Sequence, residues 1–308
     1  FESMVSRYGL PSSGEIDPTL LFAITYVLMF GFMFGDVGQG LVIALAGLYL
    51  YRKKGSGLGG VMTYAGISSA LFGFVYGSVF GSEDIIEPLW LSPLHSRDTI
   101  NTLLYIAVGY GVFINITAII ASMVNSIRMH QWGKLLFDKN GLAGLLFYGG
   151  IAVIAAVWLI TGKLYFGALS IVVVIVLPAV MIFFREPLGN LIQRKSRIFP
   201  EQKGMYVIES FFELFETVLS FFSGTVSFAR VGAFALNHAG LSLAVWTLYH
   251  MASGIGGIVV VILGNLLTIG LEGLIVGIQC MRLEYYEIFG RFYIGDGREF
   301  KTVEVTED

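Results

Sequence analysis

The chain has 308 residues, of which 56% are hydrophobic and 13% are charged, and its formal net charge is −3. Its mean hydropathy of +0.77 and its 39 glycines are typical of a polytopic helical membrane protein and exclude an ordinary soluble domain. The sequence contains no basic run suited to nucleic acid, and its single cysteine, Cys280, excludes an internal disulfide or a thiolate metal site.

The chain begins with a polar segment, 1–17, that leads abruptly into apolar sequence. We therefore expect it to be the membrane part of a longer protein, with 1–17 as the junction to a cytoplasmic domain. The apolar run that follows is too long for one crossing and is broken by a glycine-rich stretch around Asp36. This pattern predicts a hairpin of two helices, roughly 18–35 and 37–51.

Further along the chain, windows without charged residues mark more membrane-spanning helices. Each window reaches the ~20 residues needed to cross the hydrocarbon core. The predicted helices are roughly 58–81, 99–123, 141–162 and 164–184. Two much longer segments, roughly 205–250 and 256–290, exceed the bilayer thickness as helices and must tilt steeply or project into water. We expect an all-α polytopic fold of eight transmembrane helices over 18–290, and a cytoplasmic tail over 291–308.

The distribution of basic residues supports this topology. If both termini are cytoplasmic, the inner segments carry fifteen Lys and Arg residues, whereas the outer loops carry only Arg97 and Lys163. Cytoplasmic loops of membrane proteins are enriched in Lys and Arg, so an extra or missing crossing would remove the contrast.

Glycine motifs repeat in the first and third predicted helices, where Phe30–Val37 resembles Phe72–Val79. Both contain the GxxxG spacing, which lets helix backbones approach closely in lipid, so helix packing is the favoured interpretation. Asp36, next to the last residue of the first motif, is expected near the outer surface, where helix capping or solvation explains it.

Two arginines, Arg230 and Arg282, lie within the long apolar segments. The 41 residues between Arg230 and Glu272 contain no Asp, Glu, Lys or Arg. Arginine keeps its charge in proteins, and a charge at the bilayer centre costs at least a few kcal/mol, so the default interpretation is functional. The alternatives are an arginine whose side chain reaches the interface, or one paired with a buried carboxylate for assembly only.

Polar residues of the last two segments recur at spacings of three, four or seven, which places them on one face of each helix. On the seventh segment they include Glu216, Ser223, Ser227, Arg230 and Asn237, followed by His238. On the eighth they include Asn265, Glu272, Gln279 and Arg282. In lipid, such stripes must face each other, a protein partner or water. A proton or cation path is favoured over a hydrogen-bonded ladder that only holds the helices together.

These residues also resemble a known family. Ser227–Ser242 resembles the seventh-helix signature of the stator subunit of rotary V-type and A-type ATPases, called subunit a in eukaryotes and subunit I in archaea and bacteria. Glu272–Glu287 and Phe292–Gly297 resemble its eighth helix and tail. Phe32–Gly40 is similar to its first-hairpin motif, and Tyr8–Pro18 to the junction that leads into its membrane half.

The resemblance implies a non-catalytic subunit, without cofactor or metal, that moves H⁺ or Na⁺ as part of an ATP-hydrolysing or ATP-synthesising rotary complex. In the family, the two long helices face a rotating ring of c/K-type proteolipid subunits. Arg230 matches the essential arginine and Arg282 the second, while Glu216, His238 and Glu272 fall at positions that line or flank two half-channels. The cytoplasmic half would bind the other stator and stalk subunits. The lack of a long outer insertion implies a bacterial or archaeal plasma membrane.

Two other functions are compatible with a membrane protein of this composition. A stand-alone ion channel or secondary transporter would need substrate contacts within the chain and inverted repeats, and the short glycine repeat covers too little sequence for that. A purely structural scaffold would tolerate a neutral polar residue in place of Arg230. Neither alternative explains both arginines together with both polar stripes.

Overall fold

The computed structural model describes residues 1–12, 14–82, 85–90, 93, 96–163, 167, 170, 172–192, 203–252 and 254–297. Parts of two predicted segments, 164–184 and 291–308, lie outside these residues, at 164–166, 168–169, 171 and 298–308. Every named element in the described part of the chain is a helix, so the predicted all-α class is confirmed.

The helices of the amino-terminal half are α1 (Glu2–Tyr8), α2 (Thr19–Phe34), α3 (Val37–Lys54), α4 (Gly57–Tyr76), α5 (Arg97–Arg128), α6 (Trp132–Phe137) and α7 (Leu142–Thr161). Those of the carboxyl-terminal half are η1 (Val172–Val176), α9 (Leu177–Phe183), α10 (Arg185–Ile192), α11 (Lys203–Ser227), α12 (Ala229–Met251), α13 (Ile255–Leu267), η2 (Thr268–Glu272), α14 (Gly273–Leu283), η3 (Glu284–Phe289) and α15 (Gly290–Phe292). The three η elements are π-helical turns.

In the described part of the chain, five helical runs are long and apolar enough to cross a membrane, and they are Gly57–Tyr76, Arg97–Arg128, Trp132–Thr161, Gly204–Met251 and Ile255–Phe292. The pair Val172–Phe183 and Arg185–Ile192, bent by 73°, makes a sixth if it counts as one span. α2 is apolar but has only 16 residues, and α3 carries three basic residues in its last turn. The structure thus shows a multi-pass helical protein, and the number of eight crossings stays a prediction.

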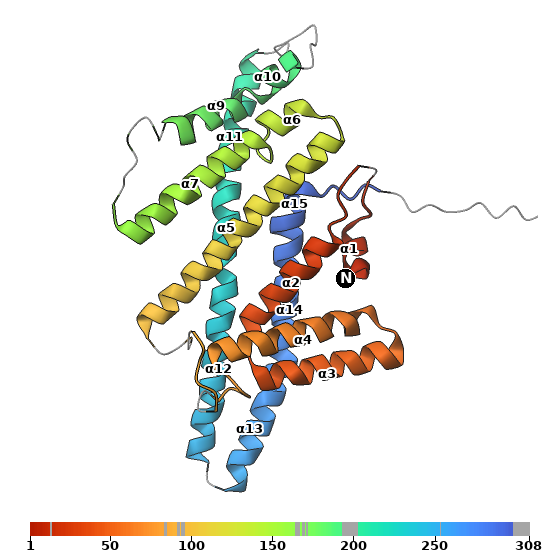
Figure 1. Cartoon of the computed structure of the whole chain (residues 1–308), viewed down its shortest axis with the longest axis vertical. Coiled ribbons are helices and arrows are strands. Elements are labelled where there is room, and N and C mark those ends of the chain that lie inside the picture. Colours follow the sequence, from red (N-terminus) through yellow and green to blue (C-terminus); the bar gives the residue numbers. More distant parts are fainter. Residues whose placement is uncertain are drawn as a thin grey trace, which may run out of the picture.

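The last two predicted segments form two long runs of consecutive helices, which we call the two long lines, and these run side by side (Figure 1). The first consists of α11 and α12, separated only by Phe228, and the second runs from α13 to α15 through two π turns. α3 and α4 run across these lines in the same view. Because the helices point in different directions, they cannot all stand upright in one membrane, and some of them must be tilted.

A seam of glycines joins α3 and α4. A Cβ atom on Gly66 would lie 2.4 Å from the backbone nitrogen of Ala44, and one on Gly47 would lie 2.6 Å from that of Thr63. Without side chains at these positions, the two helix backbones touch directly. The glycines of the repeated motifs belong to the same packing, since a Cβ on Gly73 would lie 2.3 Å from the nitrogen of Val37.

Asp36 caps the amino end of α3, and its side chain accepts a hydrogen bond from the backbone N–H of Gln39. The expected capping is therefore present, but the expected solvation is not, because Asp36 is 0% exposed. A carboxylate can be buried in this way because protein donors replace the water that it loses.

The two ends of the described chain pack against each other beside α5. The Tyr293 hydroxyl donates to the backbone oxygen of Gly9, and the backbone N–H of Ile294 donates to the carboxylate of Glu15. Burial raises the pKa of Tyr293 to about 12, so its hydroxyl keeps its proton and its hydrogen bond at neutral pH. Both ends therefore lie on the same side of the bundle.

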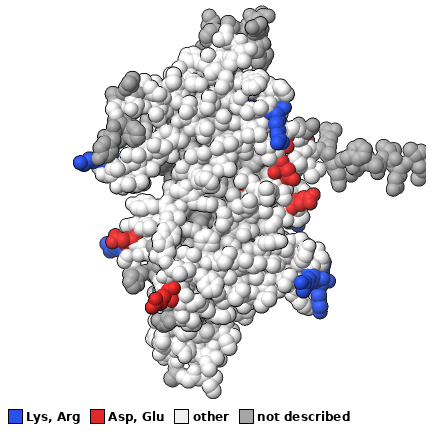
Figure 2. Space-filling view, viewed as in Figure 1, with Lys and Arg blue, Asp and Glu red and all other residues white. Residues whose placement is uncertain are grey.

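Much of the surface is apolar. On the face shown in Figure 2, charged side chains occupy a few places near the edges, and wide areas carry none. Large apolar side chains such as Phe211, Phe215 and Phe222 of α11 are more than half exposed. Such a surface suits contact with lipid or with other membrane subunits rather than with water.

Candidate functional site

The two arginines come together where α12 faces α14. Arg230, in the first turn of α12, donates hydrogen bonds from Nη1 to Gln279 Oε1 at 2.9 Å and from Nη2 to Ser227 Oγ at 3.2 Å. Both partners are neutral, so neither hydrogen bond neutralises this guanidinium. The two polar stripes meet at this point.

A cavity of about 530 Å³ opens beside Arg230. Its lining residues come from both long lines and are Ser223, Ser227, Arg230, Arg282, Leu283, Tyr286 and Glu287. Two guanidiniums, two serine hydroxyls and a carboxylate therefore share one cavity between the last two predicted crossings. This arrangement can hold a polar or charged group that approaches the arginines from the side.

A second buried cluster lies about two turns further along α12. His238 Nδ1 lies 2.8 Å from Glu272 Oε2, and Asn237 Nδ2 donates to Glu272 Oε1 at 3.0 Å. His238 and Glu272 are each only 4% exposed, and the imidazole packs against the ring of Phe34, with centroids 4.7 Å apart. Both carboxylate oxygens have a donor, which requires the proton of a neutral His238 to be on Nδ1.

The backbone at this cluster is irregular. Glu272 is the last residue of the π turn η2, and a second π turn, η3, contains Tyr286 and Glu287. A π turn holds one more residue than an α turn and so shifts the direction of the side chains that follow it. Such turns are frequent at functional sites. The spacing of the polar residues gave no sign of them.

Two of the predicted residues lie apart from these clusters. Asn265 is bonded to the first hairpin, because its Oδ1 accepts from Nε2 of Gln39 on α3 at 2.8 Å. The Glu216 side chain is 72% exposed and lies 3.4 Å from the Lys139 ammonium. Glu216 is therefore at the surface, and Asn265 joins the last line to the first hairpin.

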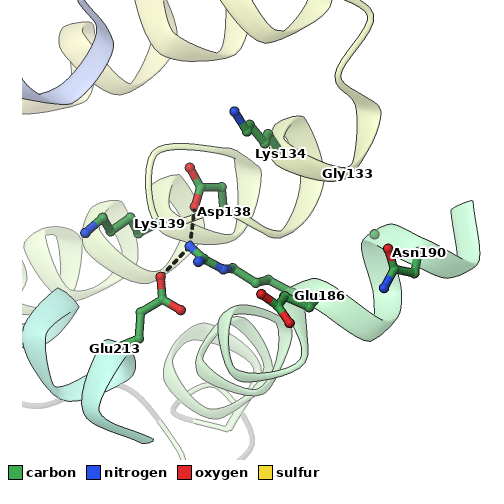
Figure 3. A pocket seen from close by; sticks show the side chains of 9 residues that line it. Gly133, Lys134, Asp138, Lys139, Glu186, Asn190 and Glu213 are labelled. Atoms are coloured by element: carbon green, nitrogen blue, oxygen red, sulfur yellow. Dashed lines mark hydrogen bonds and ion pairs between the residues drawn. The ribbon is translucent and has the colours of Figure 1, made fainter. Parts of the chain in front are cut away.

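Hollows continue from the arginines toward Glu216. Tyr286 and Glu287 also line a cavity of about 240 Å³ that includes Glu216 and Lys139. Lys139 in turn lines a third hollow, of about 720 Å³, which is bordered by Asp138, Arg185 and Glu213 among others (Figure 3). Each cavity thus shares lining residues with the next, and the three together extend from Arg230 to the end of the bundle where α6 and α10 lie.

The third hollow is lined by charges of both signs. Arg185 forms ion pairs with Glu213 and with Asp138, the latter at 3.2 Å, and Glu186 lies beside them (Figure 3). Because these charges are paired, the hollow has no strong excess of positive or negative charge.

Three residues were not predicted as site residues. Glu287 and Lys139 line the cavities described above, and Asp36 forms a buried carboxylate site elsewhere. Glu287 follows Arg282 by five residues, so only the π turn brings it to the same space. In the sequence, Lys139 is one of the basic residues assigned to a cytoplasmic loop, and no regular spacing connects it with Glu216.

The sequence is similar to known proteins. Residues 1–79 match the family model of the V-type ATPase 116kDa subunit family. Three similar proteins are each named A-type ATP synthase subunit I. The Halobacterium salinarum protein is 28% identical over 97% of this chain and 49% of its own length. The Aeropyrum pernix protein is 26% identical over 99% and 50%, and the Saccharolobus solfataricus protein 27% over 98% and 52%.

The chain spans about half the length of the curated relatives it matches. Their similarity covers nearly the whole of this chain. Together with the apolar helical runs, these matches show that the chain is similar to the V-type ATPase 116kDa subunit family over residues 1–79 and to A-type ATP synthase subunit I proteins over nearly its whole length.

Proposed function

We propose that this chain is the membrane part of a rotary ATPase stator subunit and carries H⁺ or Na⁺ between two half-channels and a rotating ring of c/K-type subunits. The observation that carries the proposal is the cavity of about 530 Å³ in which Arg230 and Arg282 meet. The names of the relatives, A-type ATP synthase subunit I, support the same assignment.

The arginines are suited to ion exchange with a carboxylate on the ring. A guanidinium that keeps its charge stabilises the ionised form of an approaching carboxylate, which then releases its ion. Among the described residues, Arg230 hydrogen-bonds to the neutral groups of Gln279 and Ser227, so it can still bind a carboxylate. Because arginine does not take part in proton transfer itself, it also blocks a direct leak between the half-channels.

The cavities on one side of the arginines and the buried pair on the other side support two separate access routes. The spaces that share Tyr286, Glu287 and Lys139 lead from the arginines past Glu216, which we assign to the cytoplasmic half-channel. The buried His238–Glu272 pair belongs to the half-channel of the opposite side. With both termini cytoplasmic and the two routes offset, an ion must travel round on the ring, so that transport requires rotation.

The test is ATP-driven ion pumping by vesicles that contain the whole complex. We expect Arg230→Gln to reduce pumping to the background level at matched assembly, because the glutamine amide carries no charge to stabilise the ring carboxylate. Arg128→Gln is the matched control, since Arg128 is exposed at the end of α5 and lines none of the cavities named above. Normal pumping by Arg230→Gln would refute the proposed mechanism.

A stand-alone channel is the competing function, and a second measurement separates it. The chain reconstituted without the ring should take up no ions, since the route is completed by the ring carboxylate. Ion uptake by the isolated chain would favour the channel.

A further inference from the structure

Asp36 holds a short turn, residues 78–82, which we call the Asp36 turn. Its Oδ2 accepts from the Ser78 hydroxyl at 2.6 Å and from the backbone N–H of Gly81 at 2.7 Å, and its Oδ1 accepts from the backbone N–H of Phe80 at 3.1 Å. Phe80 and Gly81 both have positive φ angles, of 49° and 76°. The buried carboxylate thus organises the donors of a backbone that would otherwise be unfavourable.

The Asp36 turn lies against the polar face of α12. A Cβ on Gly81 would lie 2.8 Å from Ser242 Cβ, and Trp246 Nε1 donates to the backbone oxygen of Phe80 at 3.1 Å. His238, Ser242 and Trp246 follow one another at intervals of four, so they share one face of the helix. The turn therefore covers the same face that carries His238.

A cavity of about 20 Å³ remains between the turn and this face, and it is lined by His238, Ser242, Ala239 and Gly81, among others. His238 is 4% exposed and Ser242 is 7% exposed. Within the described chain, neither His238 Nε2 nor Ser242 Oγ has a hydrogen-bond partner. Since Nδ1 is bonded to Glu272, Nε2 is the nitrogen left for the cavity.

We propose that this cavity binds one water molecule, which donates to His238 Nε2 and hydrogen-bonds to Ser242 Oγ. The volume is enough for a single water, and buried polar groups in proteins are nearly always hydrogen-bonded to protein or to ordered water. Asp36 acts as a positioning residue, because it holds the turn that forms one wall of the site.

The role of this water rests on the proposed function. In a proton-carrying subunit, a proton that arrives on the water binds His238 Nε2 while the proton on Nδ1 passes to the Glu272 carboxylate. The imidazole stays neutral overall and ends with its proton on Nε2, and the Glu272 carboxyl becomes neutral. The water thus links the buried His238–Glu272 pair to the side of the bundle where the Asp36 turn lies.

The first experiment is a cryo-EM map of the whole complex at a resolution that shows ordered water. We expect density within hydrogen-bond distance of both His238 Nε2 and Ser242 Oγ in the wild type, and weakened or absent density in Ser242→Ala. A wild-type map that shows other waters but none in this cavity would overturn the proposal.

The second experiment is pumping in proton-loaded vesicles over a range of pH. Ser242→Ala removes one partner of the water, and Ala239→Val fills the cavity with methyl groups. Both should pump about threefold to tenfold more slowly, as expected for the loss of one hydrogen bond, with a displaced pH profile. Thr247→Ala, which removes an exposed hydroxyl bonded to Leu243, is the matched control and should pump as the wild type does.

Failure of the water proposal can be told apart from failure of the proposed function. If Arg230→Gln does not pump while Ser242→Ala and Ala239→Val both keep the wild-type rate and pH profile, the stator function stands and the relay is refuted. If Arg230→Gln pumps normally, the proposed function is refuted. The cryo-EM density in the cavity then tests the water site independently of that function.

Discussion

Two buried acids, Asp36 and Glu284, show how surroundings decide the state of the same chemical group. Each is 0% exposed. Asp36 receives four hydrogen bonds, from three backbone N–H groups and the Ser78 hydroxyl, as expected for an ionised carboxylate.

Within the described residues, the Glu284 carboxyl has one hydrogen-bond partner, the Thr25 hydroxyl. Thr25 Oγ1 lies 2.7 Å from the Leu21 carbonyl oxygen and 2.5 Å from Glu284 Oε1. A carbonyl can only accept, so the threonine proton goes to Leu21, and the proton of the shorter contact belongs to Glu284. Glu284 is therefore a neutral acid that donates to Thr25.

We predict losses of stability of different size for the two amide substitutions. Asp36→Asn replaces an acceptor oxygen by a donor and should destabilise the protein by roughly 3 kcal/mol, the value of one or two hydrogen bonds to a charged group. Glu284→Gln keeps a donor toward Thr25 and should cost less than about 1 kcal/mol. Unfolding of both variants in the same detergent provides the measurement, and an equal loss of stability would contradict the assigned charges.

At the scale of the helices, the glycine seam shows why the pair α3 and α4 packs so closely. Gly40 and Gly47 on one helix, and Gly59, Gly66 and Gly73 on the other, recur every seven residues. This period keeps them on one side of each helix. The spacing could have been found in the sequence, whereas the partner of each glycine could not.

We predict that Gly66→Ala separates this pair. The added Cβ would lie 2.4 Å from the Ala44 nitrogen, and a backbone atom cannot move aside without shifting its helix, which typically costs about 1–3 kcal/mol. Gly109→Ala in α5 is the control, because no atom lies within 4 Å of its added Cβ. Thermal unfolding should show a clear loss for the first variant and none for the second.

The site elements were predicted only in part. Helical spacing singled out Arg230, Gln279 and Glu272, and the family resemblance added His238; the structure places the four residues in two facing pairs. The spacing assumed regular helices, so it could not anticipate the π turns that direct Glu272 and Glu287. It also placed Asn265 in the same stripe, whereas that amide is bonded to Gln39 of the first hairpin.

At the scale of the whole molecule, the packing of the two chain ends joins the first helices to the last. Tyr285 donates to the Met4 carbonyl, and Asn125 of α5 donates to the Phe292 carbonyl. These contacts place both ends on one side of the bundle. If both termini are cytoplasmic, the predicted topology also specifies the side of the membrane on which each loop lies.

Cysteine labelling tests this topology, because the native Cys280 is fully buried. Lys54→Cys and Lys163→Cys replace two exposed lysines. Lys54 is the last residue of α3, and Lys163 lies just after the end of α7. With three crossings between them, a membrane-impermeant maleimide should label the first from the cytoplasmic side and the second from the outer side. Labelling of both positions from the same side would contradict the predicted count.

The sequence by itself determined the class of the protein, since composition and charge-free windows decide which solvent surrounds a segment. It also determined the candidate charged residues, because a few charges in apolar sequence stand out without any structure. Only the tertiary structure decided what each charge contacts. Partners such as Gln279 for Arg230, Gln39 for Asn265, and the turn over Ser242 come from distant parts of the chain. Helical periodicity specifies the face of a helix but not the neighbour that the face meets.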